Sequence, residues 1–261
     1  MIYTHNIDPV FLSIGPVNLY WYGLMYAISF ILIDYMIKRD IKKNLFNFSP
    51  NFVDNFLIFS LISLLIGGRL GYVLFYDLSY YLDNPIRIFM IWQGGMSFHG
   101  GLLGILIGNL ILSRNQNIKF FEISDLISLH IPIGLGLGRI GNFINGELYG
   151  KPTNSDWGII FPAIDQIPRH PSMLYEAFLE GFVLFFIMRS FFYKKSNTGI
   201  LTSLFLIFYG VFRFIIEFIR VPDRHLGYLY NDWLTMGQLL CIPMVLTGII
   251  IIYFSKKTIN K

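Results

Sequence analysis

Seven apolar stretches set the strongest limit on how this chain folds. Each is long enough, or nearly so, to cross a hydrocarbon core, which takes about 20 helical residues. They lie near residues 19–37, 54–76, 96–112, 123–138, 173–193, 199–219 and 234–254. Only 14% of the residues are charged and 54% are hydrophobic, whereas about a quarter of a soluble domain is charged. We therefore expect an all-α, polytopic integral membrane protein with about seven transmembrane helices.

The fourth stretch, 123–138, is short and polar for a span. It contains Asp125, His130, Pro132 and three glycines. Such residues are tolerated where a helix is buried among other helices. We expect this stretch to cross inside the bundle, although the sequence leaves open whether it crosses fully.

The basic residues between the stretches predict the orientation, because positively charged loops stay in the cytoplasm. One side of the membrane receives Lys38, Arg39, Lys42, Lys43, Arg114, Lys119, Arg189, Lys194, Lys195, Lys256, Lys257 and Lys261. The other side receives Arg87, Arg139, Lys151, Arg169, Arg220 and Arg224, and the first 18 residues contain none. The N-terminus is therefore expected outside and the C-terminus in the cytoplasm. The same clustering between apolar runs argues against a nucleic-acid partner for the net charge of +4.

We expect one integral membrane domain over residues 1–261, because no internal repeat or low-complexity linker divides the chain. An outside loop of about 139–172 is rich in Gly, Pro and Asn, and we expect it to contribute to a site. Residues 1–18 are mildly apolar, and two interpretations stay open for them: an arm in the outer interface or a disordered leader.

Ionisable groups inside spans are costly, so they indicate where function lies. His99 begins the third stretch near the outer surface, and Arg139 lies where the fourth emerges. Tyr26 lies roughly 10 Å and Arg213 about 9 Å below the outer surface, at 1.5 Å per helical residue. Four polar groups from four helices thus converge on the outer half of the membrane.

Tyr209, Arg213 and Glu217 are spaced by four residues and share one helix face. They are interpreted either as part of a site or as a structural Arg–Glu pair. The Gly138–Glu147 run is expected to lie outside the span, where its backbone amides and Arg139 would hold a phosphate. The Gly67–Gly71 run favours close helix packing, and the role of Arg69 within it stays open.

The chain offers little evidence for a nucleophile or a metal site of its own. Ser172 beside His170 is weak evidence for a catalytic pair, because Ser172 is also a natural helix N-cap. The single cysteine, Cys241, lies in an apolar run and is expected to be a small core residue. His and Cys residues do not occur at metal-ligand spacing.

Five segments in order closely resemble the bacterial prolipoprotein diacylglyceryl transferase family. They are residues 21–26, 99–104, 138–147, 170–176 and 213–220. The resemblance covers nearly the whole chain, and the Arg-Ile-Gly-Asn-Phe-Ile-Asn-Gly-Glu run is the family's signature. One small departure is Val221, where a polar or acidic residue is common in the family.

The resemblance implies an enzyme of the bacterial cytoplasmic (inner) membrane with its site toward the outer leaflet. It implies transfer of the diacylglyceryl group of phosphatidylglycerol to the lipobox cysteine thiol of a prolipoprotein, with release of glycerol phosphate and without a cofactor or metal. The expected catalytic residues are His99, Arg139, Arg213, Tyr26 and Tyr209. The expected substrate-binding residues are Arg139, Asn142, Asn145, Glu147, Gly150, Arg213, Glu217 and Arg220.

Within this set, guanidinium groups suit a phosphate. His99 is the candidate base for the thiol. Glu147 and Glu217 are expected to orient the arginines. Two other classes stay open: a transporter or lipid-binding membrane protein, and another outer-leaflet transferase that uses a phospholipid. The sequence does not identify the lipoproteins served, the lipid route or the oligomeric state.

Overall fold

The computed structural model describes residues 2–15, 17–46, 48–91, 94–193, 197–222 and 227–257. Only the backbone is described for Val17, Pro50, Asn51, Phe98, His99, Lys256 and Lys257. The chain divides into two compact units, one of Met1–Tyr35 with Asp125–Lys261 and one of Met36–Ser124. Each unit is considered by itself below.

The described chain is mostly helical. Its longer helices are α1 (Trp21–Lys42), α2 (Pro50–Phe75), α4 (Phe98–Gln116), α5 (Phe120–Ile144), α8 (Ile200–Ile216) and α9 (Met236–Lys257). One further helical stretch is continuous and consists of α6 (Ser172–Glu176), the π-helical segment η3 (Ala177–Val183) and α7 (Leu184–Phe192). Each apolar stretch identified in the sequence coincides with one of these helices or with this stretch.

Three helices of the described part are long and apolar enough to cross a membrane by length and composition. They are Phe52–Phe75 in α2, Phe120–Ile144 in α5 and Met236–Ser255 in α9. Helix α8 is apolar but shorter. These helices give the chain the character of a membrane protein.

The expectation of an all-α fold is confirmed in that the chain is mostly helical, and two small sheets are the exceptions. Strand β2 (Val10–Ile14) pairs with β3 (Val17–Tyr20) in an antiparallel hairpin. A second small sheet joins β1 (Tyr3–Thr4) to β4 (Ile159–Ile160) and β4 to β5 (Pro168–Arg169). The N-terminal segment is therefore ordered by strand pairing, and the disordered-leader interpretation is wrong.

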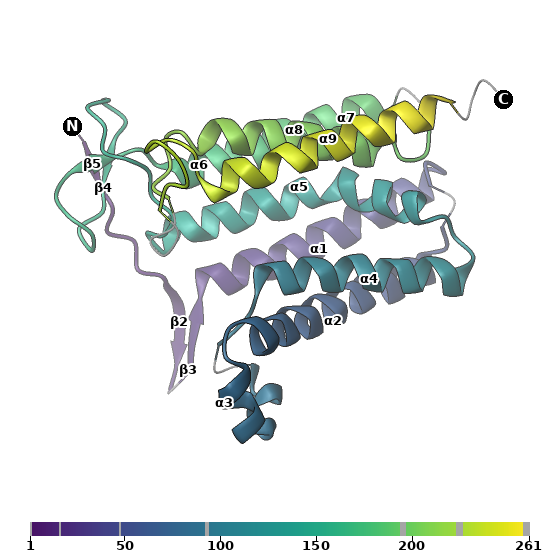
Figure 1. Cartoon of the computed structure of the whole chain (residues 1–261), viewed down its shortest axis with the longest axis horizontal. Helices are drawn as coiled ribbons and strands as arrows, with labels where there is room; N and C mark the ends of the chain where they lie inside the picture. Colours follow the sequence, from purple (N-terminus) through teal and green to yellow (C-terminus); the bar gives the residue numbers. More distant parts are fainter. Residues whose placement is uncertain are drawn as a thin grey trace. The chain divides into compact units, whose positions relative to one another are not determined.

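Small residues bring α2 and α4 together in the second unit, where the two helices lie side by side (Figure 1). A methyl group on Gly104 would lie 2.2 Å from the carbonyl oxygen of Ser63, and one on Gly67 would lie 2.4 Å from that of Gly100. Any larger side chain would force the helices apart. The interpretation of the Gly67–Gly71 run as a packing surface is confirmed.

Arg69, whose role the sequence left open, is a structural anchor within this unit. Its side chain is 4% exposed. Its guanidinium group donates to the carbonyl oxygens of Ile88, Gly95 and Met90 at 2.8, 3.0 and 3.3 Å, and to those of Arg87 and Gly94. The side chain thereby fixes η1 (Pro85–Phe89), which follows α3 (Leu78–Asp83), together with Met90, Gly94 and Gly95 before α4.

We expect Arg69→Lys to lower the stability of the protein by about 1–3 kcal/mol, because one ammonium group cannot replace a guanidinium that serves several buried carbonyl groups. The measurement is thermal unfolding in detergent, together with limited proteolysis of residues 84–95. Arg87→Lys is the matched control, because Arg87 is exposed in the same segment. An unchanged melting temperature and unchanged proteolysis in Arg69→Lys would contradict the anchoring role.

In the first unit, the polar residues of the fourth apolar stretch are satisfied inside the protein. Asp125 accepts hydrogen bonds from the backbone N–H groups of Gly199 and Thr202 at 2.6 and 2.8 Å. These contacts cap the N-terminus of α8, where helices leave N–H groups unpaired. The His130 ring donates to the carbonyl oxygen of Leu126 at 2.8 Å. Helix α5 therefore carries these polar side chains without leaving them unpaired.

Candidate active site

The site begins at the C-terminal end of α5, which extends further than the sequence indicated. The helix continues to Ile144, so Arg139 projects from a helix and not from a loop. The backbone N–H groups of Asn145, Gly146 and Glu147 donate to carbonyl groups of the preceding turn. The prediction that the backbone amides of residues 138–147 hold a phosphate is therefore wrong, because these amides are already bonded. The loop that follows α5 begins near residue 145 and not near 139.

The glycine-rich sequence of residues 138–147 led to the incorrect prediction of a loop, because Gly141 instead allows close helix packing. A methyl group on Gly141 would lie 2.8 Å from the ring of Tyr22 in α1. The glycine allows the two helices to approach, whereas a run of Gly and Asn in sequence resembles a turn. The turn itself comes at Gly146, whose φ of +68° is readily adopted by glycine.

A chain of side-chain hydrogen bonds links the end of α5 to the loop. Arg139 donates to Asn142 Oδ1 at 3.5 Å, and the Asn142 amide donates to Glu147 Oε2 at 3.3 Å. The Asn145 amide donates to Glu147 Oε1 at 3.3 Å. Glu147 thus reaches Arg139 through Asn142 and holds both asparagine side chains.

Glu176 joins the two arginines that the sequence singled out. Its side chain is 0% exposed. Arg139 Nε lies 2.6 Å from Glu176 Oε2, and Arg213 Nη1 lies 2.7 Å from Glu176 Oε1. One carboxylate therefore bridges α5 and α8. Glu176 was not among the residues predicted for the site. Its position near the start of the apolar stretch 173–193 was the available signal, because a carboxylate inside a span indicates a functional role.

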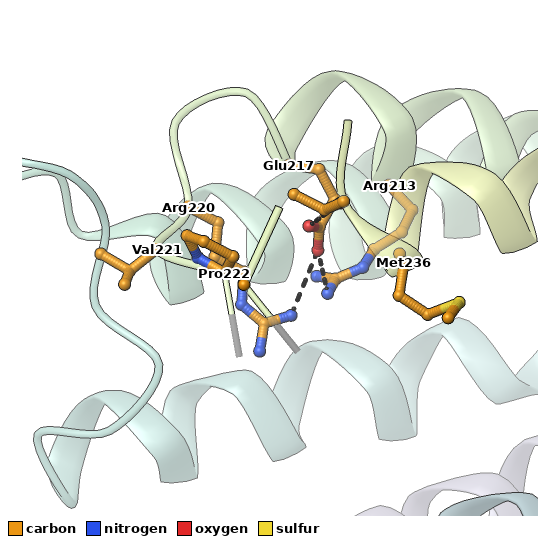
Figure 2. Close-up of a pocket in the computed structure, with 9 residues that line it drawn as sticks. Arg213, Glu217, Arg220, Val221, Pro222 and Met236 are labelled. Atoms are coloured by element: carbon orange, nitrogen blue, oxygen red, sulfur yellow. Dashed lines mark hydrogen bonds and ion pairs between the residues drawn. The ribbon is translucent and has the colours of Figure 1, made fainter. Parts of the chain in front are cut away.

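Glu217 is the second buried carboxylate of the site and follows the end of α8. Its Oε1 lies 2.5 Å from Arg213 Nη2 and 3.3 Å from Arg220 Nη1. Its Oε2 accepts a hydrogen bond from the Thr235 hydroxyl at 2.7 Å. Figure 2 shows Arg213 and Arg220 directed toward Glu217 at a pocket also lined by Val221, Pro222 and Met236. The pairing of Arg213 with Glu217 that the spacing indicated is present.

Two tyrosines of the predicted set lie on helices of the same unit. The Tyr26 hydroxyl is 3.1 Å from that of Tyr22, which packs against Gly141. Tyr209 lies one turn before Arg213 on α8 and stacks on Phe205, with ring centroids 5.6 Å apart. Both tyrosines therefore belong to helices that carry or contact the arginine cluster.

Gly150 fixes the loop after α5 against the end of α8. Its N–H donates to the His170 carbonyl at 2.8 Å, and Lys151 donates to the Ile219 carbonyl at 2.8 Å. A methyl group on Gly150 would lie 2.7 Å from both carbonyl oxygens. The absence of a side chain at this position lets the loop pair with the backbone at Arg220.

His170 and Ser172 do not form a nucleophile and base pair. The Ser172 hydroxyl donates to the Leu148 carbonyl at 2.7 Å, and the His170 ring lies 3.3 Å from the Tyr175 hydroxyl. Burial lowers the pKa of His170, which favours the neutral ring. Ser172 is the first residue of α6 rather than its N-cap, a shift of one position from the prediction.

His99 and Cys241 are the remaining residues that the sequence singled out. His99 is the second residue of α4 in the second unit, but its side chain lies outside the described residues. Cys241 is buried, as expected for a core residue. Among the described residues, no group of three or more His, Cys, Asp or Glu side chains is placed to hold a metal ion.

Comparison with known proteins identifies one family. A family model described as prolipoprotein diacylglyceryl transferase matches residues 9–254. A phosphatidylglycerol–prolipoprotein diacylglyceryl transferase of Methylococcus capsulatus is 49% identical over 247 residues, which are 94% of each chain. Proteins of the same name from Pseudomonas putida and Nitratidesulfovibrio vulgaris are 48% and 47% identical, over 96% and 95% of this chain and 94% and 95% of their own lengths.

Proposed function

Because the chain belongs to the prolipoprotein diacylglyceryl transferase family, we propose that it transfers the diacylglyceryl group of phosphatidylglycerol to the lipobox cysteine thiol of prolipoproteins. The products are a thioether-linked lipoprotein precursor and glycerol phosphate. This reaction is the first step of lipoprotein maturation. The names of the relatives and the chemistry of the arginine cluster support the proposal.

The observation that carries the proposal is the excess of positive charge in the buried cluster. Arg139, Arg213 and Arg220 contribute three positive charges, and Glu176 and Glu217 contribute two negative charges. These five ion-paired side chains leave one positive charge, which matches the single negative charge of a phosphate diester. Guanidinium groups bind phosphate oxygens in pairs, so Arg139 and Arg213 are suited to hold this group.

The bond changes follow from the products. The thiolate sulfur attacks the glycerol carbon that bears the phosphate, the carbon–sulfur bond forms, and the carbon–oxygen bond breaks. The bonding electron pair stays with the phosphate oxygen, so negative charge on the leaving group grows in the transition state. Fixed cations at this position stabilise such charge more in the transition state than in the ground state.

A base must remove the thiol proton, and we assign that role to His99. A thiol with a pKa of about 8.5 and an imidazole of about 6.5 exchange a proton near neutral pH. Tyr26, Asn142, Asn145, Gly150 and Tyr209 shape the lipid site. Glu147 holds the two asparagines, and Glu217 orients Arg213 and Arg220.

We further propose seven spans in the bacterial inner membrane, with the N-terminus and the arginine cluster toward the outer face. The Lys and Arg distribution supports this orientation. Reporter fusions after residue 45 and at the C-terminus are expected to report cytoplasm, and a fusion near residue 155 is expected to report the outside. A cytoplasmic signal near residue 155 would place the cluster at the wrong face for exported prolipoproteins.

The function is tested with purified protein, phosphatidylglycerol and a lipobox peptide. Mass spectrometry is expected to detect a thioether-linked diacylglyceryl peptide together with one equivalent of glycerol phosphate. A peptide with Ser in place of Cys is the matched control and should give no product. Absence of product with the Cys peptide, from a folded protein in phosphatidylglycerol-containing micelles, contradicts the proposed function.

Cys241→Ala is expected to keep transfer within about twofold of the parent protein. The reacting thiol belongs to the peptide, and Cys241 is the only cysteine of the chain. The substitution removes one buried sulfur atom, an ordinary core change of about 1 kcal/mol. The measurement is initial transfer rate beside melting temperature. Loss of turnover in a variant that melts normally would show that an enzyme thiol takes part.

A further inference from the structure

Glu180 is a buried carboxyl group for which the proposed mechanism so far has no use. Its side chain is 0% exposed, and neither carboxylate oxygen has a hydrogen-bond partner among the described residues. It lies in η3, four residues after Glu176 on the same continuous helical stretch. Single π-helical turns are frequent at functional sites.

The packing of η3 against α5 places Glu180 near the arginine cluster. Gly181 approaches Gly136 so closely that a methyl group on it would lie 2.5 Å from the Gly136 Cα atom. Gly136 lies one turn before Arg139 on α5. Glu180 interacts electrostatically with Glu176, Arg213, Arg139 and Glu217.

An ionised, buried carboxylate without a hydrogen-bond donor is unfavourable, because it has lost its hydrogen bonds to water and has no replacement for them in the protein. Arg139 and Arg213 already pair with Glu176, and Arg213 also pairs with Glu217. Glu180 therefore carries a proton in this arrangement. A protonated carboxyl group has one O–H to donate, and residues four apart on a helix are neighbours.

Binding of a phosphate changes which groups neutralise the Glu176 carboxylate. When phosphate oxygens occupy Arg139 and Arg213, the Glu176 carboxylate loses its closest cations while it stays buried. A neighbouring O–H donor would then stabilise it through a charge-assisted hydrogen bond, which is about twice as strong as a neutral one. Phosphate can then replace Glu176 as the partner of Arg139 and Arg213, and the buried Glu176 carboxylate still has a hydrogen-bond donor.

We propose that Glu180 is a positioning residue that donates its O–H to Glu176 when a lipid phosphate takes over Arg139 and Arg213. This role rests on the proposed function. It assigns to Glu180 no contact with the lipid and no part in breaking bonds. Its effect is on the affinity for phosphatidylglycerol.

The test compares two substitutions of similar size. Glu180→Gln keeps an N–H donor and cannot titrate, whereas Glu180→Met has no donor. Glu180→Met is expected to raise the KM for phosphatidylglycerol by about tenfold or more, as for loss of one hydrogen bond to a charged group, with a smaller effect on kcat. Glu180→Gln is expected to keep KM within about threefold of the parent value. Glu122→Gln, at the start of α5, controls for the loss of a carboxylate elsewhere.

Two results would overturn the role of Glu180. They are a parent-like KM in Glu180→Met and a KM in Glu180→Gln as high as in Glu180→Met. If both variants fail to fold, infrared spectroscopy of the parent protein decides. With ¹³C-labelled glutamate, a protonated carboxyl band is expected without phosphatidylglycerol and should shift when the lipid is added. Absence of the band, or a band that the lipid leaves unchanged, contradicts the proposal.

The two proposals fail in different ways. If the parent protein forms no thioether product, the proposed function is wrong. If the parent protein transfers normally and Glu180→Met does too, only the role of Glu180 is wrong.

Discussion

Arg213→Ala is expected to reduce transfer about 100- to 1,000-fold, the effect of removing one group that stabilises developing negative charge. The protein should still fold. Glu176 keeps Arg139 as a partner, and Glu217 keeps Arg220 and the Thr235 hydroxyl. Neither carboxylate is left alone, so a modest fall in melting temperature is expected beside the large loss of rate. The measurement is initial transfer rate and thermal unfolding on the same preparation.

Two further variants separate phosphate binding from structural pairing. Arg213→Lys keeps the charge and loses the planar fork, so it should restore little of the rate. The double variant Arg213→Ala, Glu217→Gln removes the charge that Arg213 neutralises and should remain inactive. Recovered turnover in the double variant would show that Arg213 serves only to pair with Glu217.

Glu176→Ala is expected to destabilise the protein by about 1–3 kcal/mol, because Arg139 and Arg213 lose the buried carboxylate that bridges them, while Arg213 keeps Glu217. The same account predicts that phosphatidylglycerol restores part of this stability, since its phosphate then occupies the place between Arg139 and Arg213. We expect the lipid to raise the melting temperature of Glu176→Ala more than that of the parent protein. The measurement is thermal unfolding in micelles with and without phosphatidylglycerol.

Asp54→Ala is the matched control, because Asp54 is an exposed carboxylate that pairs with Lys38 rather than with an arginine of the cluster. It should melt close to the parent protein, with an ordinary response to the lipid. Equal stabilisation of Glu176→Ala and the parent protein by phosphatidylglycerol would argue that the phosphate does not enter between the two arginines.

The sequence predicted those parts of the fold that depend on local properties. Apolar length located the helices, and spacing by four residues identified the Arg213–Glu217 pair, because a helix fixes which side chains are neighbours. The small residues around Gly67 indicated close packing for the same reason. Each of these inferences needs only residues that are adjacent on one helix.

Contacts between distant segments were beyond the sequence. Glu176 is 37 residues from both Arg139 and Arg213 in the chain, so no local spacing pointed to the bridge. Gly141 was interpreted as part of a loop because its packing partner, Tyr22, lies on another helix. Arg69 stayed unassigned because its partners are backbone carbonyl groups, which no sequence pattern marks.

The central claim is that Arg139 and Arg213 hold the phosphate of phosphatidylglycerol. Native mass spectrometry measures it directly, by comparing the binding of phosphatidylglycerol with that of diacylglycerol carrying the same acyl chains. The parent protein should prefer phosphatidylglycerol. The double variant Arg139→Gln, Arg213→Gln should bind the two lipids nearly equally. A folded double variant that keeps the full preference for phosphatidylglycerol would contradict the claim.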